Sequence, residues 1–105
     1  MDYQKIAGEM SDICGFERDP MIRYADVMSE MGELGKELLL SSHYGAKPFQ
    51  PTDNLAKELG DVIFALSLLA NALKLDLDEC FEITMDKYNK RYKESGQIGS
   101  QTLSS

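Results

Sequence analysis

Two pairs of acidic residues are the part of this sequence best suited to chemistry. Glu30 and Glu33 form the first pair, and Glu58 and Asp61 form the second. Residues three apart in a helix share a face, so each pair presents its carboxylates in one direction. The second pair also opens a strongly apolar segment, where a carboxylate is costly unless it is paired or bound to a metal.

The two pairs would converge if their segments packed as an antiparallel helical hairpin. Four carboxylates in one pocket repel each other, so such a site requires cations. Ligands that are all oxygen favour Mg²⁺, with Mn²⁺ as a substitute, over zinc or iron. The single histidine, His43, cannot supply the paired Glu-x-x-His motifs of a di-iron bundle. Glu37 shares the face of the first pair, and is either a further metal ligand or a surface residue.

Four helices are expected to position these groups. Apolar periodicity predicts them over residues 2–14, 20–43, 54–74 and 77–94. Asp19 followed by Pro20 is a typical helix start, Thr52 or Asp53 would cap the third helix, and Asp76 the fourth. Residues 44–51 hold two prolines and a glycine, and form a loop. No strand-like alternation or internal repeat appears.

These elements predict an all-α, antiparallel four-helix bundle. Residues 1–94 would form one domain, and the Gly/Ser-rich residues 95–105 a flexible C-terminal tail. The third helix is apolar around almost its whole circumference, which four short helices can hardly cover. We therefore expect a homodimer or homotetramer.

Composition narrows the possible partners. The chain has 105 residues and a net charge of −7, from 18 acidic and 11 basic residues. This balance disfavours binding to nucleic acid, but a metal can still bridge acidic groups to a nucleotide. The two cysteines suggest no disulfide framework or zinc site, and neither a signal peptide nor a membrane span is visible. We expect a cytoplasmic protein without a membrane partner.

The acidic pairs, taken with their neighbours, resemble a known family. Glu30-Met31-Gly32-Glu33-Leu34 and Glu58-Leu59-Gly60-Asp61-Val62 resemble the Glu-x-x-Glu, spacer, Glu-x-x-Asp signature of the MazG-like all-α nucleoside triphosphate pyrophosphohydrolases. Leu69-Ala70-Asn71, Leu75-Asp76-Leu77 and the Lys87–Tyr92 stretch are also similar. The resemblance covers roughly Tyr24 to Tyr92.

The resemblance implies a hydrolase that cuts an NTP or dNTP to the monophosphate and pyrophosphate, with cleaning of the nucleotide pool as a candidate role. Mg²⁺ would be bound by Glu30, Glu33, Glu58 and Asp61, and Glu30 or Glu33 would also orient the attacking water. The cations Lys87 and Arg91, one turn apart, would contact the phosphates. Asn71 would hydrogen-bond the substrate, or else bridge helices.

Other functions remain open at this point. The same fold serves phosphoribosyl-ATP and dUTP pyrophosphohydrolases, and a non-catalytic helical oligomerisation module would also fit the pattern. Some dCTP-hydrolysing relatives use tryptophans around the base and a tyrosine one turn after the signature aspartate. This chain has no tryptophan, and Ala65 takes the tyrosine position. Tyr44 and Phe49, in the loop, are the local candidates for stacking on a base.

Overall fold

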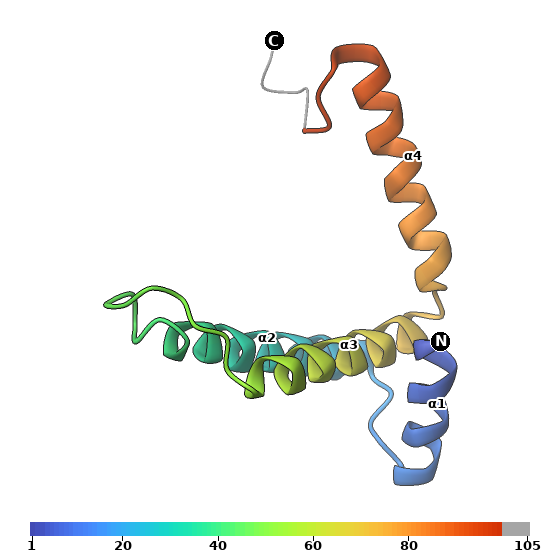
Figure 1. Cartoon of the computed structure of the whole chain (residues 1–105). Helices are drawn as coiled ribbons and strands as arrows, with labels where there is room; N and C mark the ends of the chain where they lie inside the picture. The colour runs from blue at the N-terminus through green and yellow to red at the C-terminus, as the bar shows by residue number, and fades with distance from the viewer. Residues whose placement is uncertain (100–105) are drawn as a thin grey trace. The chain divides into compact units, whose positions relative to one another are not determined.

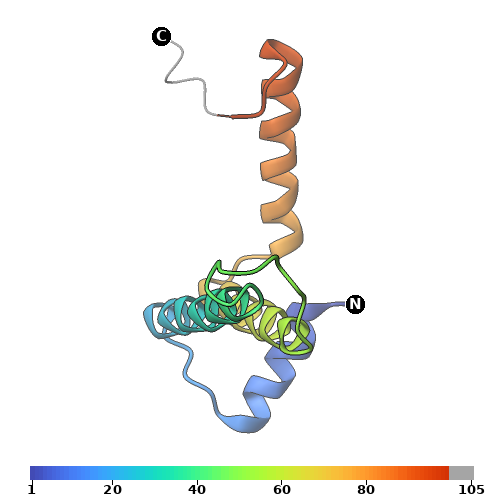
Figure 2. The same ribbon diagram turned by 60° about the vertical axis from the view of Figure 1, so that its left-hand side comes forward.

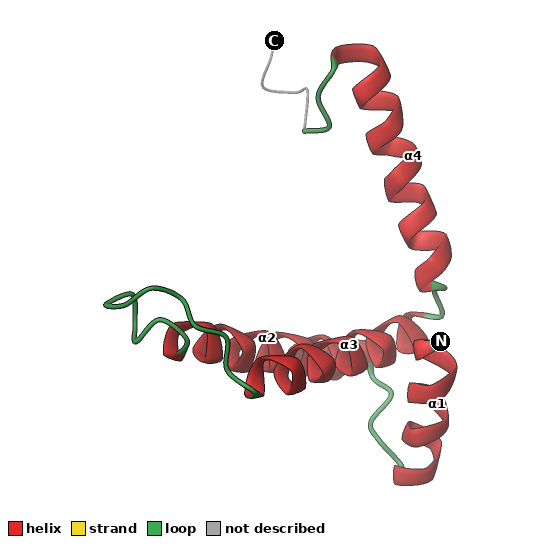
Figure 3. Ribbon diagram, viewed as in Figure 1, coloured by secondary structure: helices red, strands yellow, loops and turns green. Residues whose placement is uncertain are grey.

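The computed structural model describes residues 1–99, and they form four α-helices and no strand. The helices are α1 (Tyr3–Cys14), α2 (Pro20–Leu40), α3 (Asn54–Leu73) and α4 (Leu77–Ser95) (Figures 1 and 3). The all-α prediction is confirmed. The chain divides into one unit over Met1–Lys74, which holds α1 to α3, and a second from Leu75, which holds α4. Each is described by itself.

Three of the four helices begin at an aspartate whose side chain caps the first turn. Asp2 accepts a hydrogen bond from the backbone N–H of Lys5, Asp19 from that of Met21, and Asp76 from those of Asp78 and Glu79. These bonds satisfy amide groups that have no partner inside the helix. The starts predicted at Asp19-Pro20 and at Asp76 are confirmed.

The start of α3 differs from the prediction. Asp53 occupies the N-cap position with helical backbone angles, and its side chain makes no cap hydrogen bond. The hydroxyl of Thr52 donates instead to the carboxylate of Glu37 on α2. Neither predicted cap therefore satisfies the first turn of α3 with its side chain.

The end of α2 lies three residues before the predicted His43. His43 and Tyr44 both have positive φ angles, of 48° and 60°, which a right-handed helix cannot accommodate. Ser41 turns its hydroxyl back onto the carbonyl oxygen of Glu37, at 2.8 Å. Ser41 itself keeps right-handed helical backbone angles, so the left-handed backbone at His43 and Tyr44 is what stops the helix, and α2 ends at Leu40.

The helices α2 and α3 run antiparallel and lie side by side in both views (Figures 1 and 2). The least exposed side of α2 is a row of residues alternately four and three apart, as in a coiled-coil seam. Apolar or small members alternate in this row with charged ones. The row consists of Arg23, Val27, Glu30, Leu34, Glu37 and Ser41.

α1 packs against α3. The Asn71 side chain joins the two helices, because its Oδ1 accepts from Nε2 of Gln4 and its Nδ2 donates to the Gln4 carbonyl, both at 3.0 Å. The rings of Phe16 and Phe64 meet edge to face, with centroids 6.3 Å apart. Ala65, Ser67, Leu68 and Ala70 of α3 are buried.

Much apolar surface stays exposed within each unit. On α3 this holds for Leu59, Ile63, Leu66 and Leu73, and on α4 for Phe81, Ile83 and Tyr92. Contiguous exposed apolar area is typical of surfaces that contact other proteins, membranes or ligands. None of the four helices within residues 1–99 is both long and apolar enough to cross a membrane.

The predicted C-terminal tail falls partly outside the described residues. Ser95 is the last residue of α4, and Gly96 caps that helix with a left-handed backbone at φ 73°. The rest of the prediction, for residues 100–105, lies outside the described part of the chain.

Candidate active site

Three carboxylates converge between α2 and α3. One oxygen each from Glu30 on α2 and from Glu58 and Asp61 on α3 all lie within 4.8 Å of one another. Glu30 belongs to the α2 row described above, and Glu58 and Asp61 are one turn apart on the antiparallel helix. Ligand oxygens on opposite sides of a divalent cation are roughly 4 to 5 Å apart. The three groups therefore fit the ligand set of one shared hard cation.

The carboxylates of this cluster carry like charges that repel one another. Burial raises the pKa of Glu30, and the charges of Asp61, Asp26, Glu58 and Glu33 raise it further. The direction means that the native site resists a full set of ionised carboxylates. A bound divalent cation would relieve both the desolvation and the repulsion.

Glu33 takes a different position from the other three predicted ligands. Its side chain is exposed, and it does not belong to the group of three whose oxygens approach within 4.8 Å. Its charge still acts on Glu30. The sequence predicts four metal ligands, and the geometry brings three of them together, which leaves metal binding by Glu33 as a prediction.

Asp26 is a neighbour of the site that the sequence analysis missed. It lies one turn before Glu30, and its charge raises the pKa of that carboxyl group. Nη1 of Arg23 stands 3.8 Å from the Asp26 carboxylate, and Nε of Arg23 is buried without a hydrogen-bond partner. The spacing of Asp26 and Glu30, four residues apart on one helix, was the signal that could have revealed it.

The two predicted phosphate-binding cations lie on α4, in the second unit. Nζ of Lys87 is 4.9 Å from the centre of the Tyr88 ring, and Cζ of Arg91 is 5.9 Å from the same centre. Arg91 also donates to the carbonyl oxygen of Ile98, at 3.2 Å. Tyr88, which the sequence analysis did not single out, thus holds both cations near one ring through cation–π attraction.

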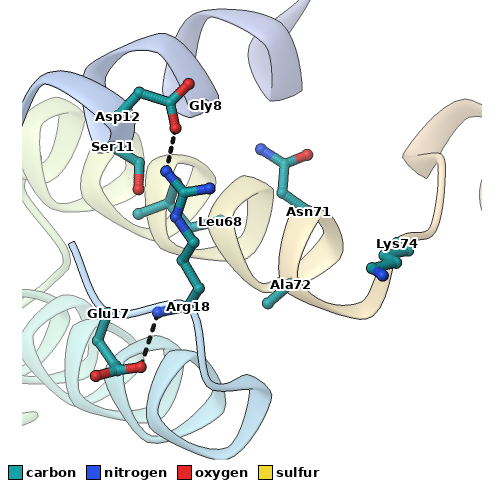
Figure 4. Close-up of a pocket in the computed structure, with 9 residues that line it drawn as sticks. All are labelled: Gly8, Ser11, Asp12, Glu17, Arg18, Leu68, Asn71, Ala72 and Lys74. Atoms are coloured by element: carbon teal, nitrogen blue, oxygen red, sulfur yellow. Dashed lines mark hydrogen bonds and ion pairs between the residues drawn. The ribbon is translucent and has the colours of Figure 1, made fainter. Parts of the chain in front are cut away.

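Asn71 lines a pocket of about 250 Å³ between α1, α3 and the segment before α2 (Figure 4). Arg18 spans this pocket, with its guanidinium paired to Asp12 and its backbone N–H bonded to Glu17. None of the three clustered carboxylates lines it. Since both amide atoms of Asn71 bond Gln4, the structure shows the helix-bridging alternative, and a substrate contact there stays a prediction.

The loop aromatics are open to solvent. Tyr44 is 66% exposed and Phe49 is 52% exposed. Both rings therefore leave area available for another group, and their role in stacking on a base stays a prediction.

Comparison with known proteins adds an independent finding. The family model of the MazG nucleotide pyrophosphohydrolase domain matches residues 21–95, which include all three clustered carboxylates and most of α2, all of α3 and all of α4. The uncharacterized protein YpjD of Bacillus subtilis (strain 168) is 37% identical over 78 residues, covering 71% of this chain and 68% of that protein. No solved structure matches the chain significantly.

Proposed function

Since the chain belongs to the MazG nucleotide pyrophosphohydrolase family, we propose that it hydrolyses a nucleoside triphosphate, NTP or dNTP, in a Mg²⁺-dependent reaction. The products are the nucleoside monophosphate and pyrophosphate. The observation that supports this proposal is the convergence of Glu30, Glu58 and Asp61 from two antiparallel helices.

The clustered carboxylates would hold the metal, and Mn²⁺ would fit the same oxygen ligands. A bound Mg²⁺ stabilises the negative charge that develops on the phosphate oxygens during the reaction. The exposed carboxylate of Glu33 would orient a water molecule and accept its proton, and Glu30 is the alternative for this role. The water oxygen bonds to the α-phosphorus as the bond from this phosphorus to the bridging oxygen breaks, and pyrophosphate leaves.

Lys87 and Arg91 would bind the departing phosphates. Their shared contact with Tyr88 restricts both side chains, which lowers the entropy lost when they order around an anion. We further propose a homodimer or homotetramer that covers the exposed apolar residues of α3. We also propose that the reaction takes place in the cytoplasm, where NTPs and dNTPs are dissolved.

A panel of NTPs and dNTPs tests the proposal, scored by pyrophosphate release with Mg²⁺, with Mn²⁺ and with EDTA. The panel includes damaged bases, dUTP and phosphoribosyl-ATP, so that it also decides between the alternative substrates. Glu58→Gln and Asp61→Asn should abolish turnover while the helical circular dichroism stays intact. Glu9→Gln, an exposed carboxylate on α1, is the matched control and should keep full activity.

Two results would overturn the proposal. Pyrophosphate release from none of these substrates would indicate a non-catalytic helical module. Full turnover by the Asp61→Asn protein would show that the acidic cluster takes no part in the reaction.

A further inference from the structure

Glu37 is a buried carboxylate that the proposed chemistry does not use. Its residue exposure is 9%, and it lies on α2 outside the group of three metal-ligand candidates. Acidic side chains are rarely buried without a partner. The partner shown here is Thr52, whose Oγ1 donates to Oε1 of Glu37.

This bond reaches the start of α3, which has no side-chain cap, unlike the other three helices of residues 1–99. The aspartates that cap α1, α2 and α4 accept hydrogen bonds from their own first turns, whereas Asp53 at the start of α3 does not. Thr52 lies two residues before the first residue of α3, and its carbonyl accepts from the N–H of Leu55 at 3.2 Å. The Thr52 side chain thus bonds α2 and not the first turn of α3, which it meets through its backbone carbonyl.

A second set of bonds supports the same junction. The hydroxyl of Ser41 donates to the carbonyl of Glu37, and the N–H of Gln50 donates to the carbonyl of Ser41, both at 2.8 Å. Ser41 is 2% exposed. The returning loop is therefore bonded to the end of α2 just before Thr52 meets Glu37.

The Glu37–Thr52 bond lies one to two helical turns from the candidate metal ligands on each helix. Glu37 follows Glu30 by two turns, or about 10 Å along α2, and Glu58 lies about 6 Å of helical rise after Asn54, the first residue of α3. Sliding α3 by one turn against α2 would move its carboxylates by about 5 Å. That displacement exceeds the 4.8 Å within which the three ligand oxygens now lie.

We propose that Glu37 and Thr52 are positioning residues, whose hydrogen bond sets the register of α3 against α2 and so holds Glu58 and Asp61 opposite Glu30. Glu37 is neither a metal ligand nor a surface residue. The consequence for turnover rests on the proposed function, whereas the consequence for metal affinity does not.

The experiment measures Mn²⁺ affinity of the full chain, without nucleotide, by titration calorimetry and electron paramagnetic resonance. Thr52→Val removes the donor at nearly constant shape and should weaken Mn²⁺ binding about tenfold or more, as is typical when a group that orients metal ligands is lost. Thr52→Ser keeps a hydroxyl and should retain affinity. Glu37→Gln keeps an acceptor oxygen and should stay within about threefold of the unmodified chain, whereas loss of a true ligand would cost far more.

A control separates register from general stability. Gln4→Ala weakens the contact between α1 and α3 away from the cluster, and should lower the melting temperature without changing Mn²⁺ affinity. With nucleotide present, Thr52→Val should raise the Mg²⁺ concentration needed for half-maximal rate, and excess Mg²⁺ should restore most of kcat. If the unmodified chain releases no pyrophosphate, the proposed function fails and the Mn²⁺ affinities still decide this inference.

Three outcomes would overturn it. Thr52→Val could bind Mn²⁺ as tightly as the unmodified chain. Glu37→Gln could lose as much affinity as Asp61→Asn, which would make Glu37 a ligand. Thr52→Val and Thr52→Ala could both fail to fold, which would make the bond a requirement of the whole fold and not of the site.

Discussion

Glu30 and Asp61 face each other across the α2–α3 hairpin, with carboxylate oxygens no more than 4.8 Å apart. After burial, Asp61 is the largest cause of the raised pKa of Glu30. Two like charges this close oppose the fold that brings them together, unless a proton or a cation lies with them. Stability, pH and metal binding are therefore linked at this contact.

The raised pKa of Glu30 fixes the sign of this linkage. The native state holds the Glu30 proton more tightly than the unfolded chain does, where the pKa is near its ordinary 4.5. The Glu30 contribution to stability is therefore lost as pH rises from 4.5 through the raised native pKa. In EDTA, the melting temperature of the unmodified chain relative to Glu30→Gln should fall over this range. Saturating Mn²⁺ should reverse the fall.

The same proton competes with the metal. Mn²⁺ affinity should weaken as pH falls through the raised pKa of Glu30, because the protonated carboxyl group must lose its proton to bind. Calorimetric titrations at successive pH values measure this dependence, and Glu33→Gln provides a comparison with Glu30 intact. An affinity that does not change with pH would show that Glu30 is not a ligand.

Removing the charge of Glu33 and removing that of Glu30 should have different effects on kcat and on Mn²⁺ affinity. Glu33 is exposed and stands outside the three converging carboxylates, so Glu33→Gln should lower kcat about a hundredfold or more, as for loss of a general base, with a small change in Mn²⁺ affinity. Glu30→Gln should lower both. Steady-state kinetics over a range of Mg²⁺ concentrations, with direct Mn²⁺ titrations, separate the two effects. Equal losses of affinity would instead make Glu33 a fourth ligand.

Local rules in the sequence account for the helices and for the shared face of Glu58 and Asp61 in the site. Asp19-Pro20 and Asp76 indicate helix starts, because a capping side chain bonds backbone N–H groups only two or three residues further along the chain. Glu58 and Asp61 share a face because the helical period requires it. Both inferences need only residues a few positions apart, and both agree with the structure.

Features that depend on register across the hairpin could not be read in this way. Thr52 has the residue type of a cap for α3, yet its hydroxyl bonds Glu37 because packing brings that carboxylate within reach. Glu33 has the spacing of a ligand, but it lies on the exposed flank of the α2 row. Which member of an acidic pair faces the neighbouring helix is decided by the rotation of both helices, a tertiary property that helical period alone does not fix.

The bridge between Asn71 and Gln4 should be worth measurable stability. Asn71→Ala removes two hydrogen bonds between α1 and α3 and should cost about 2 kcal/mol in urea denaturation, at about 1 kcal/mol for each bond. A Cβ at Gly8 would lie 3.2 Å from Nδ2 of Asn71. Gly8→Ala should therefore stabilise the Asn71→Ala protein by about 0.5–1 kcal/mol through helix propensity, and the unmodified protein by less. Equal effects in both backgrounds would contradict this crowding.

Arg23 should be expendable for stability. Its side chain is 14% exposed, its Nε is buried without an acceptor among residues 1–99, and its ion pair with Asp26 spans 3.8 Å. Replacing such an under-satisfied charge by an apolar side chain of similar size is often neutral or stabilising, by about 1–4 kcal/mol. Arg23→Met should thus leave the melting temperature unchanged or raise it. Arg18→Met, which removes an exposed ion pair with Asp12, should change stability by less than about 1 kcal/mol. A marked loss of stability in Arg23→Met alone would show that the guanidinium has a partner that stabilises the folded chain.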